Sequence, residues 1–239
     1  MSRIWISVTL LCASLSVQIS TSYAAQPDER QQSSDTSSGQ SVGPVVQWNK
    51  NLLALVRTAG AQPATVHPTR SFAIMHAAIY DAVNAIDGKH EPYLVRLPSV
   101  SKPASQEAAA AAAAHQVLIG LYPKFQPMLD SDLQQSLAQI PDGPGKDHGV
   151  SIGNNVADQI LALRSNDGSD VTPVPYVFGS APGDYQSTPP NFPKQPQFTH
   201  WATVEPFVLK SASQFRPSPP PSLPAMSTAT LLTKSKPWG

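Results

Sequence analysis

Apolar residues recur at helical spacing in five successive stretches of the chain. Within each stretch they lie three or four residues apart, which places them on one face of a helix. We therefore predict helices over residues 44–60, 67–88, 103–123, 126–140 and 146–168. This series of helical signals predicts an all-α fold.

The second stretch, "HPTRSFAIMHAAIYDAVNAIDG" (67–88), is apolar on almost every side of the helix. Pro68 suits a first helical turn, and Gly88 suits a helix end. The apolar positions are Phe72, Ile74, Met75, Ala77, Ala78, Ile79, Val83, Ala85 and Ile86. A helix with so little polar surface needs neighbours on nearly every side, so we expect it in the middle of a bundle.

Polar residues of the same stretch suggest internal contacts. His76, Tyr80 and Asn84 lie four residues apart and form one thin stripe, on which His76 could bond to Tyr80. Arg70 and Asp81 lie on nearly the same side of the helix. They therefore form either an ion pair or two separate helix contacts.

The third stretch contains seven consecutive alanines, Ala108–Ala114. Alanine is the best helix former, and its small side chain lets another backbone approach closely. We expect a tight helix contact along this run.

The character of the sequence changes after Gly168, since fourteen of the 25 prolines follow it. Proline removes a hydrogen-bond donor and blocks helix, so we predict an extended segment that wraps over a surface. A disordered tail is the alternative, but disordered tails rarely carry so many aromatic residues. These are Tyr176, Phe178, Tyr185, Phe192, Phe198, Trp201, Phe207 and Phe215.

The N-terminus is typical of a secretory signal peptide, with basic Arg3, an apolar run and small residues before a cleavage site after Ala24. A membrane anchor is the alternative, although the apolar run is short for a span. The predicted organisation is a signal peptide (1–24), a disordered linker (25–43), a helical region (44–168) and a proline-rich extended segment (169–239). We expect export to the periplasm or beyond the cell, and no membrane span after cleavage.

Composition excludes several kinds of chemistry. Cys12 is the single cysteine, so the mature chain has no disulfide and no cysteine-ligated metal. Sixteen basic and sixteen acidic residues leave no net charge, and loss of Arg3 leaves about minus one. We expect no nucleic-acid partner, because such partners select basic surfaces. No oligomeric state follows from the sequence.

Candidate catalytic residues do not form a recognisable constellation. No histidine pair has metal-ligand spacing, and there is no nucleophile elbow, phosphate-binding loop or dinucleotide fingerprint. The histidines are His67, His76, His90, His115, His148 and His200. We therefore assign no catalytic, cofactor-binding or metal-ligating residue.

Several segments nevertheless carry a family resemblance. They are "VVQWNKNLLALVRTAG", "AIMHAAIYDAVNAI", the alanine-rich stretch ending "LIGLYP", and "HWATVEPFVLKSASQFRPSPPPSL". Together they resemble the N-terminal region of bacterial vanadium-dependent haloperoxidases, in the type 2 phosphatidic acid phosphatase superfamily, over Val45–Leu223. The resemblance implies the N-terminal half of a helical-bundle fold, with peroxide-dependent halide oxidation in intact members.

The same resemblance implies a second helical half that holds vanadate or phosphate. Its motifs are Lys-x6-Arg-Pro, Pro-Ser-Gly-His and Ser-Arg-x5-Gly-x-His, which supply cationic donors and histidines to an oxyanion. None occurs here; Lys210 and Arg216-Pro217 have five intervening residues and are excluded. We therefore expect no cofactor in this chain, vanadate in a full-length relative, and no activity from this chain alone.

The C-terminal "TKSKPWG" (233–239) suggests a reason for the missing half. Codons for Asn-Glu-Val-Lys-Ala-Leu-Gly, which the resemblance implies here, can read as this tail after a one-base shift. We hypothesise a frameshift, in the gene or its sequencing, that truncates a longer enzyme. The alternatives are a fragment of a superfamily acid phosphatase and a stand-alone exported helical binding or structural protein.

Overall fold

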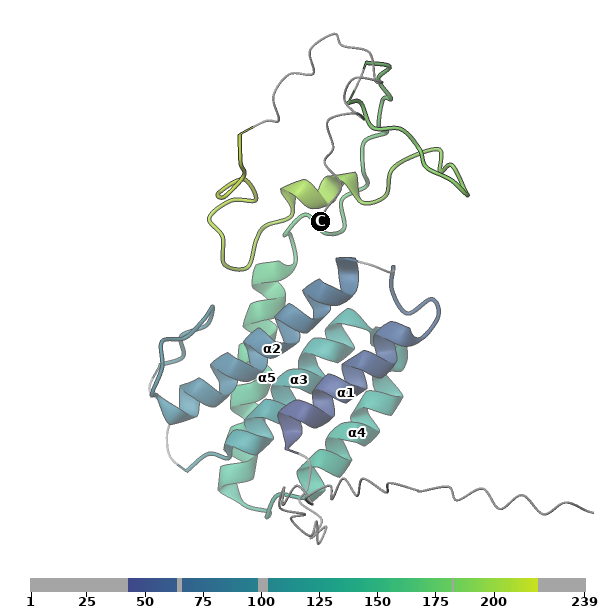
Figure 1. Ribbon diagram of the computed structural model, residues 1–239. Helices are drawn as coiled ribbons and strands as arrows, with labels where there is room; N and C mark the ends of the chain where they lie inside the picture. The colour runs from purple at the N-terminus through teal and green to yellow at the C-terminus, as the bar shows by residue number, and fades with distance from the viewer. Residues whose placement is uncertain (1–42, 64–65, 99–102, 182, 219–239) are drawn as a thin grey trace, which may run out of the picture. The chain divides into compact units, whose positions relative to one another are not determined.

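Five α-helices make up most of the structure over the described residues (Figure 1). The structure is a computed structural model that describes residues 43–63, 66–98, 103–181 and 183–218. Its helices are α1 (Pro44–Arg57), α2 (Val66–Asp87), α3 (Gln106–Leu121), α4 (Gln126–Ala138) and α5 (Pro144–Arg164), with short 3-10 helices η1 (Pro123–Phe125) and η2 (Thr199–Thr203). These residues contain no strand, so the all-α prediction is confirmed.

The helix ends follow local chemistry and differ from the predicted bounds by a few residues. Ser105 caps α3 by accepting the N–H of Ala108 at 3.1 Å. Proline occupies the first turn of α5, which therefore begins at Pro144 rather than Lys146. Gly88 ends α2 in the left-handed conformation, with φ of 66°.

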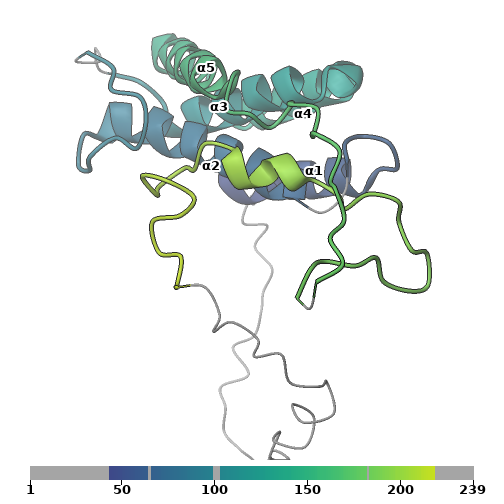
Figure 2. The same cartoon turned by 90° about the horizontal axis from the view of Figure 1, so that it is seen from above.

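Helix α3 lies at the centre of the helical region. It packs against all four other α-helices, and α1 and α2 lie on the same side of α3 in Figure 2. All seven alanines from Ala108 to Ala114 are buried, with at most 2% of their surface exposed. The expectation that residues 67–88 occupy the middle was wrong in this respect, because the small alanine side chains let neighbours approach α3 from every side.

The alanine run does make the expected close contact. Gly149 and Gly153 of α5 face Ser105, Ala109 and Ala113 of α3 so closely that neither glycine has room for a Cβ atom. Glycine on one helix and alanine on the other therefore fix how near the two backbones come.

Helix α2 is buried on several sides, but its polar residues do not make the contacts predicted for them. His76 Nε2 lies 3.0 Å from Asn49 Oδ1 of α1, whereas the Tyr80 hydroxyl donates to the Glu91 carbonyl. The predicted bond between His76 and Tyr80 was therefore wrong. Each side chain hydrogen-bonds to a neighbouring segment, His76 to α1 and Tyr80 to the loop after α2, and not to the other.

Arg70 and Asp81 also have separate partners. Asp81 accepts backbone N–H groups from residues 93–95, and Arg70 binds Asp167. Of the two readings of these residues, the intrahelical ion pair was wrong and the separate contacts are observed.

The described residues after α5 form irregular chain with several bends and turns, and η2 is their one helical element. Phe207 packs against the hydrophobic core, and the Glu205 N–H donates to the Asp167 carbonyl at 2.8 Å. Phe192 and Phe215 are exposed instead of covering the helices. The predicted signal peptide, nearly all of the predicted linker and the "TKSKPWG" tail lie outside the described residues.

No α-helix within the described ranges has the length and apolar character needed to cross a membrane.

Candidate functional site

A buried ionic cluster surrounds Asp167, which follows α5 by three residues. Its Oδ2 atom lies 2.7 Å from Arg70 Nε of α2 and 2.7 Å from Arg164 Nη2 of α5. Asp167 Oδ1 accepts the Ser169 N–H at 3.0 Å. Burial opposes ionisation of Asp167, but hydrogen bonds from Arg70 and Ser169 outweigh it and hold the pKa of this carboxyl below its ordinary value.

Arg164 connects this cluster to the proline-rich segment. Its Nη2 atom donates to the Glu205 carbonyl at 2.6 Å, and its guanidinium carbon lies 4.0 Å from the centre of the Phe207 ring. The Arg164 carbonyl in turn accepts from Arg70 at 2.8 Å. Residues 205–207 are thus held by a planar cation that makes hydrogen bonds at its edge and stacks by its face.

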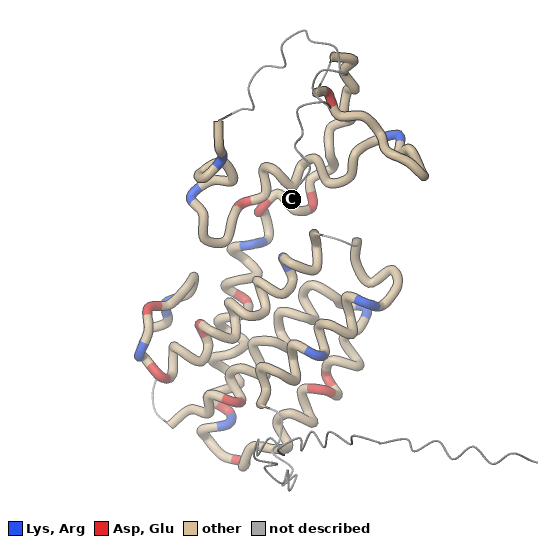
Figure 3. Tube along the Cα trace, viewed as in Figure 1, with Lys and Arg blue, Asp and Glu red and all other residues tan. Residues whose placement is uncertain are grey.

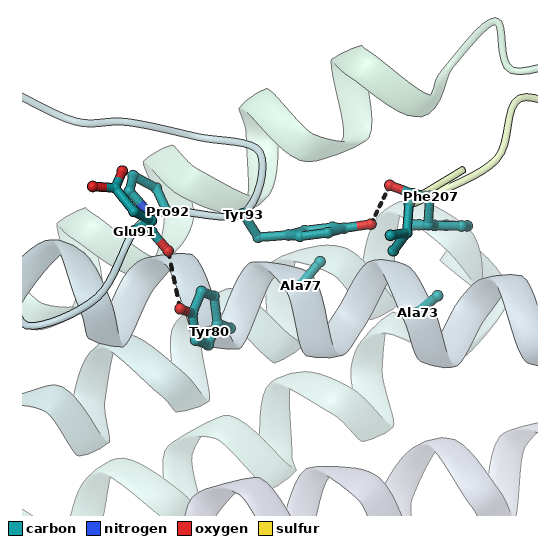
Figure 4. Close-up of a pocket in the computed structure, with 8 residues that line it drawn as sticks. Ala73, Ala77, Tyr80, Glu91, Pro92, Tyr93 and Phe207 are labelled. Carbon is teal, nitrogen blue, oxygen red and sulfur yellow. Dashed lines mark hydrogen bonds between the residues drawn. The ribbon is translucent and has the colours of Figure 1, made fainter. Parts of the chain in front are cut away.

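A mostly apolar pocket of about 550 Å³ lies beside this segment (Figure 4). Ala73 and Ala77 of α2 form its floor, and Tyr93 reaches across them toward Phe207. Its full lining is Ala73, Ala77, Tyr80, Glu91, Pro92, Tyr93, Phe207 and Val208. The Tyr93 and Tyr80 hydroxyls donate to the carbonyls of Phe207 and Glu91, so both phenols have structural partners. Burial raises the pKa of Tyr93, which keeps its hydroxyl protonated as a donor.

Asp81 determines the path of the loop that carries Tyr93. The carboxylate is 1% exposed and accepts backbone N–H groups of Tyr93, Leu94 and Val95 at 2.5, 2.8 and 2.8 Å. Asn84 supports the same loop by bonding the N–H and the carbonyl of His90. Side chains of α2 therefore hold the loop beside the pocket in place through hydrogen bonds to its backbone.

Replacing Asp81 by asparagine is expected to lower the free energy of unfolding by about 2 kcal/mol, because an amide cannot accept all three N–H groups from the same positions. Urea unfolding followed by circular dichroism measures this loss. Asp158, which bonds Gln116 on the exposed surface, offers a matched control. Asp158→Asn should unfold at the wild-type urea concentration; equal losses in both variants would contradict the role given to Asp81.

The six histidines do not gather in one site of the described structure. His76 contacts Asn49, His115 Nε2 lies 2.7 Å from Asp130 Oδ1, and His148 lies 3.2 Å from the Pro103 carbonyl. His67 and His200 share a cluster of aromatic rings. Among the described residues, no three His, Cys, Asp or Glu side chains gather in a way that could hold a metal ion.

Lys210 and Arg216 are both exposed, on irregular chain beyond η2. The Lys210 backbone N–H bonds to the Gln214 side chain and the Arg216 N–H to the Ser213 carbonyl, which gives local turns. The structure does not bring these two side chains to the pocket or to the Asp167 cluster.

Sequence reasoning did not identify Asp167, and it did not identify the loop N–H groups that Asp81 binds. A usable signal for Asp81 was present, since a lone carboxylate inside an apolar helix must find donors when the helix is buried. Asp167 carried no such signal, because the residues after a helix are ordinarily exposed and polar.

Comparison with known proteins places the fold. No family model matches the chain, and no curated protein matches it. Among solved structures, it is similar to the first bacterial vanadium-dependent iodoperoxidase, with a TM-score of 0.57 and 24% sequence identity, over 76% of this chain and 46% of that chain. This chain thus spans less than half the length of that enzyme. A likeness at this level of identity shows the fold, and the chain has a haloperoxidase-like fold.

Proposed function

We propose that this chain supplies the N-terminal helical half of a vanadium-haloperoxidase-like enzyme whose complete form oxidises halide with hydrogen peroxide. The likeness in fold to the vanadium iodoperoxidase, over three quarters of this chain, supports the proposal. The family segments found in the sequence, from Val45 to Leu223, support it independently.

The residues described here do not fit a bound vanadate. An oxyanion of high charge needs cationic donors that are not already neutralised. Arg70 and Arg164 converge, but they converge on the carboxylate of Asp167 and on backbone carbonyls. The other Lys and Arg positions are spread along the described chain (Figure 3). We therefore propose that the described residues support the fold, and that an oxyanion site requires residues outside them.

The mature chain alone is expected to oxidise no halide. Purified protein would be given vanadate, hydrogen peroxide and iodide, and triiodide formation would be followed by its absorbance. The rate should equal that of free vanadate without protein, because the described residues offer no cradle of free cationic donors to bind the oxyanion. A protein-dependent rate that saturates as vanadate is added would overturn the proposed inactivity.

Sequencing the coding DNA from about codon 215 through several hundred downstream bases tests the proposed truncation. Translation in three frames should reveal Pro-Ser-Gly-His and the arginine–histidine motif in a shifted frame. An intact frame ending in a stop codon, with neither motif downstream, would favour the stand-alone helical protein instead.

We also propose export, on the strength of the N-terminal residues described above. Amino-terminal sequencing of the protein recovered from the producing cells or their medium should begin at Ala25. Recovery of a chain that still begins at Met1 would contradict cleavage.

A further inference from the structure

Four aromatic side chains join η2 to the start of α2, and we call them the aromatic clasp: His67, Phe198, His200 and Trp201. The His67 ring lies 4.8 Å from the Trp201 ring and 5.1 Å from the Phe198 ring, measured between centroids. His200 lies 5.7 Å from Trp201 and 6.4 Å from Phe198. Phe198 has φ of 56°, a conformation that a bulky residue adopts only where its surroundings hold it.

Two nitrogens of the clasp are buried without a partner. Neither His67 Nδ1 nor His200 Nδ1 has a hydrogen bond within the described structure. His200 Nε2 lies 3.1 Å from the Ser169 carbonyl, which can only accept, so this nitrogen carries the proton of the neutral ring. A proton on the Nδ1 atom of either ring would be buried with no acceptor.

Charged groups around His67 act in opposite directions. Burial lowers the pKa of His67 most, and the neighbouring His200 and the Arg70 of α2 lower it further, whereas Asp170 after α5 raises it. Asp167 is already bound by Arg70 and Arg164 and is not free to pair with an imidazolium. His67 also lies in the first turn of α2, where the helix dipole disfavours a cation.

We propose that the aromatic clasp is an acid-sensitive latch, which holds η2 against α2 while His67 is neutral and releases η2 when His67 is protonated. Release should be local. Residues 205–207 keep their own anchors through Arg164, Tyr93 and the Asp167 carbonyl, none of which depends on histidine.

The direction of the pH effect follows from linkage. The folded-state pKa of His67 lies below its ordinary value of 6.5, which the unfolded chain retains. The stabilisation that the neutral clasp contributes is therefore complete above pH 6.5. It is lost as the pH falls from there through the lower folded-state pKa.

Fluorine NMR of the mature chain labelled with 5-fluorotryptophan tests the latch. Trp201→Phe identifies the Trp201 resonance by its absence. In the unsubstituted protein we expect that resonance to move toward the position of an exposed tryptophan as the pH falls from about 7.5 to about 5, with a midpoint below 6.5. A Trp201 resonance that is constant over this range would overturn the proposal.

Two variants separate the clasp histidines from other titrating groups. His67→Phe keeps an aromatic ring and removes the titration, so its Trp201 transition should be abolished or displaced by at least about one pH unit. His148→Gln changes a histidine of α5 that contacts Pro103, outside the clasp, and should leave the wild-type transition in place. An unchanged transition in His67→Phe would overturn the assignment to the clasp.

Hydrogen exchange measures whether release is local, with rates corrected for the pH dependence of the chemistry. Below the midpoint, amides of residues 199–204 should exchange at least tenfold faster, whereas the Glu205 amide, which donates to Asp167, should remain protected. Equal loss of protection at Glu205 would indicate general unfolding and contradict the latch. This outcome is independent of whether the protein belongs to a haloperoxidase.

Discussion

Replacing Gly153 by valine is expected to lower the free energy of unfolding by about 3 kcal/mol or more. A Cβ atom at this position would overlap the Ala109 carbonyl of α3, and it would lie 2.8 Å from the Ala113 nitrogen and 2.9 Å from the Ala112 Cβ. Two of these obstacles are backbone atoms of a buried helix and the third is a Cβ atom fixed to that backbone, so none can rotate away as a longer side chain can. The two helices would have to separate and open the buried alanine face of α3.

Urea unfolding monitored by circular dichroism measures this effect, with Gly145→Ala as the matched control. Gly145 lies on the same helix, but its added Cβ would meet only the Pro103 carbonyl, at 3.9 Å. Alanine should therefore leave stability unchanged or raise it by up to about 1 kcal/mol through helix propensity. Wild-type stability in Gly153→Val would show that the backbones of α3 and α5 are not in contact.

Removing the Asp167 carboxylate is the second change with a large expected effect. Asp167→Ala leaves Arg70 and Arg164 without their shared counter-ion. The site is buried, since the side chain of Asp167 is 1% exposed, that of Arg164 5% and that of Arg70 16%. Breaking a buried pair in this way costs about 3–5 kcal/mol, because an uncompensated charge remains inside. Denaturant unfolding should show a loss of this size.

The control for Asp167 is Asp142, which pairs with Lys146 while 97% of its side chain is exposed. Asp142→Asn should not change the unfolding midpoint measurably, since water already solvates that pair. If Asp167→Ala were as stable as Asp142→Asn, the ionic cluster would contribute nothing to the attachment of residues 205–207.

Lowering the pH should weaken the ion pairs of Asp167 in the unsubstituted protein and lower its stability. The folded-state pKa of Asp167 lies below its ordinary value of 3.8, so the stability from its ionised form is complete above that pH. This contribution is lost as the pH falls below 3.8 through the folded-state pKa. In Asp167→Asn this part of the acid sensitivity should be absent, which comparison of urea midpoints over that range would detect.

Much of the fold follows from the local sequence. Proline at the start of α5 and glycine after α2 determine helix ends within a few residues. The spacing of apolar residues determines which faces of the helices are buried. Even the close approach to Ala108–Ala114 could be expected from side-chain size, although the sequence did not show that Gly149 and Gly153 would lie opposite.

The partners of the polar residues could not be predicted in this way. Arg70 binds Asp167, 97 residues further on, and not Asp81 on its own helix. His67 meets Phe198 and Trp201 from the far end of the described chain. The choice among possible partners depends on how the helices are packed, which no short stretch of sequence contains.

The sequence by itself determined the five helices, their approximate ends and the small-residue face of α3, because periodicity, capping and side-chain volume act over a few residues. The resemblance to haloperoxidases rests instead on particular segments of the sequence. Only the tertiary structure decided that α3 is the central helix, that Asp167 joins two arginines, and that the aromatic clasp holds η2. Those contacts join residues that are distant in sequence, and they exist only once helix packing has brought their side chains within a few ångströms of one another.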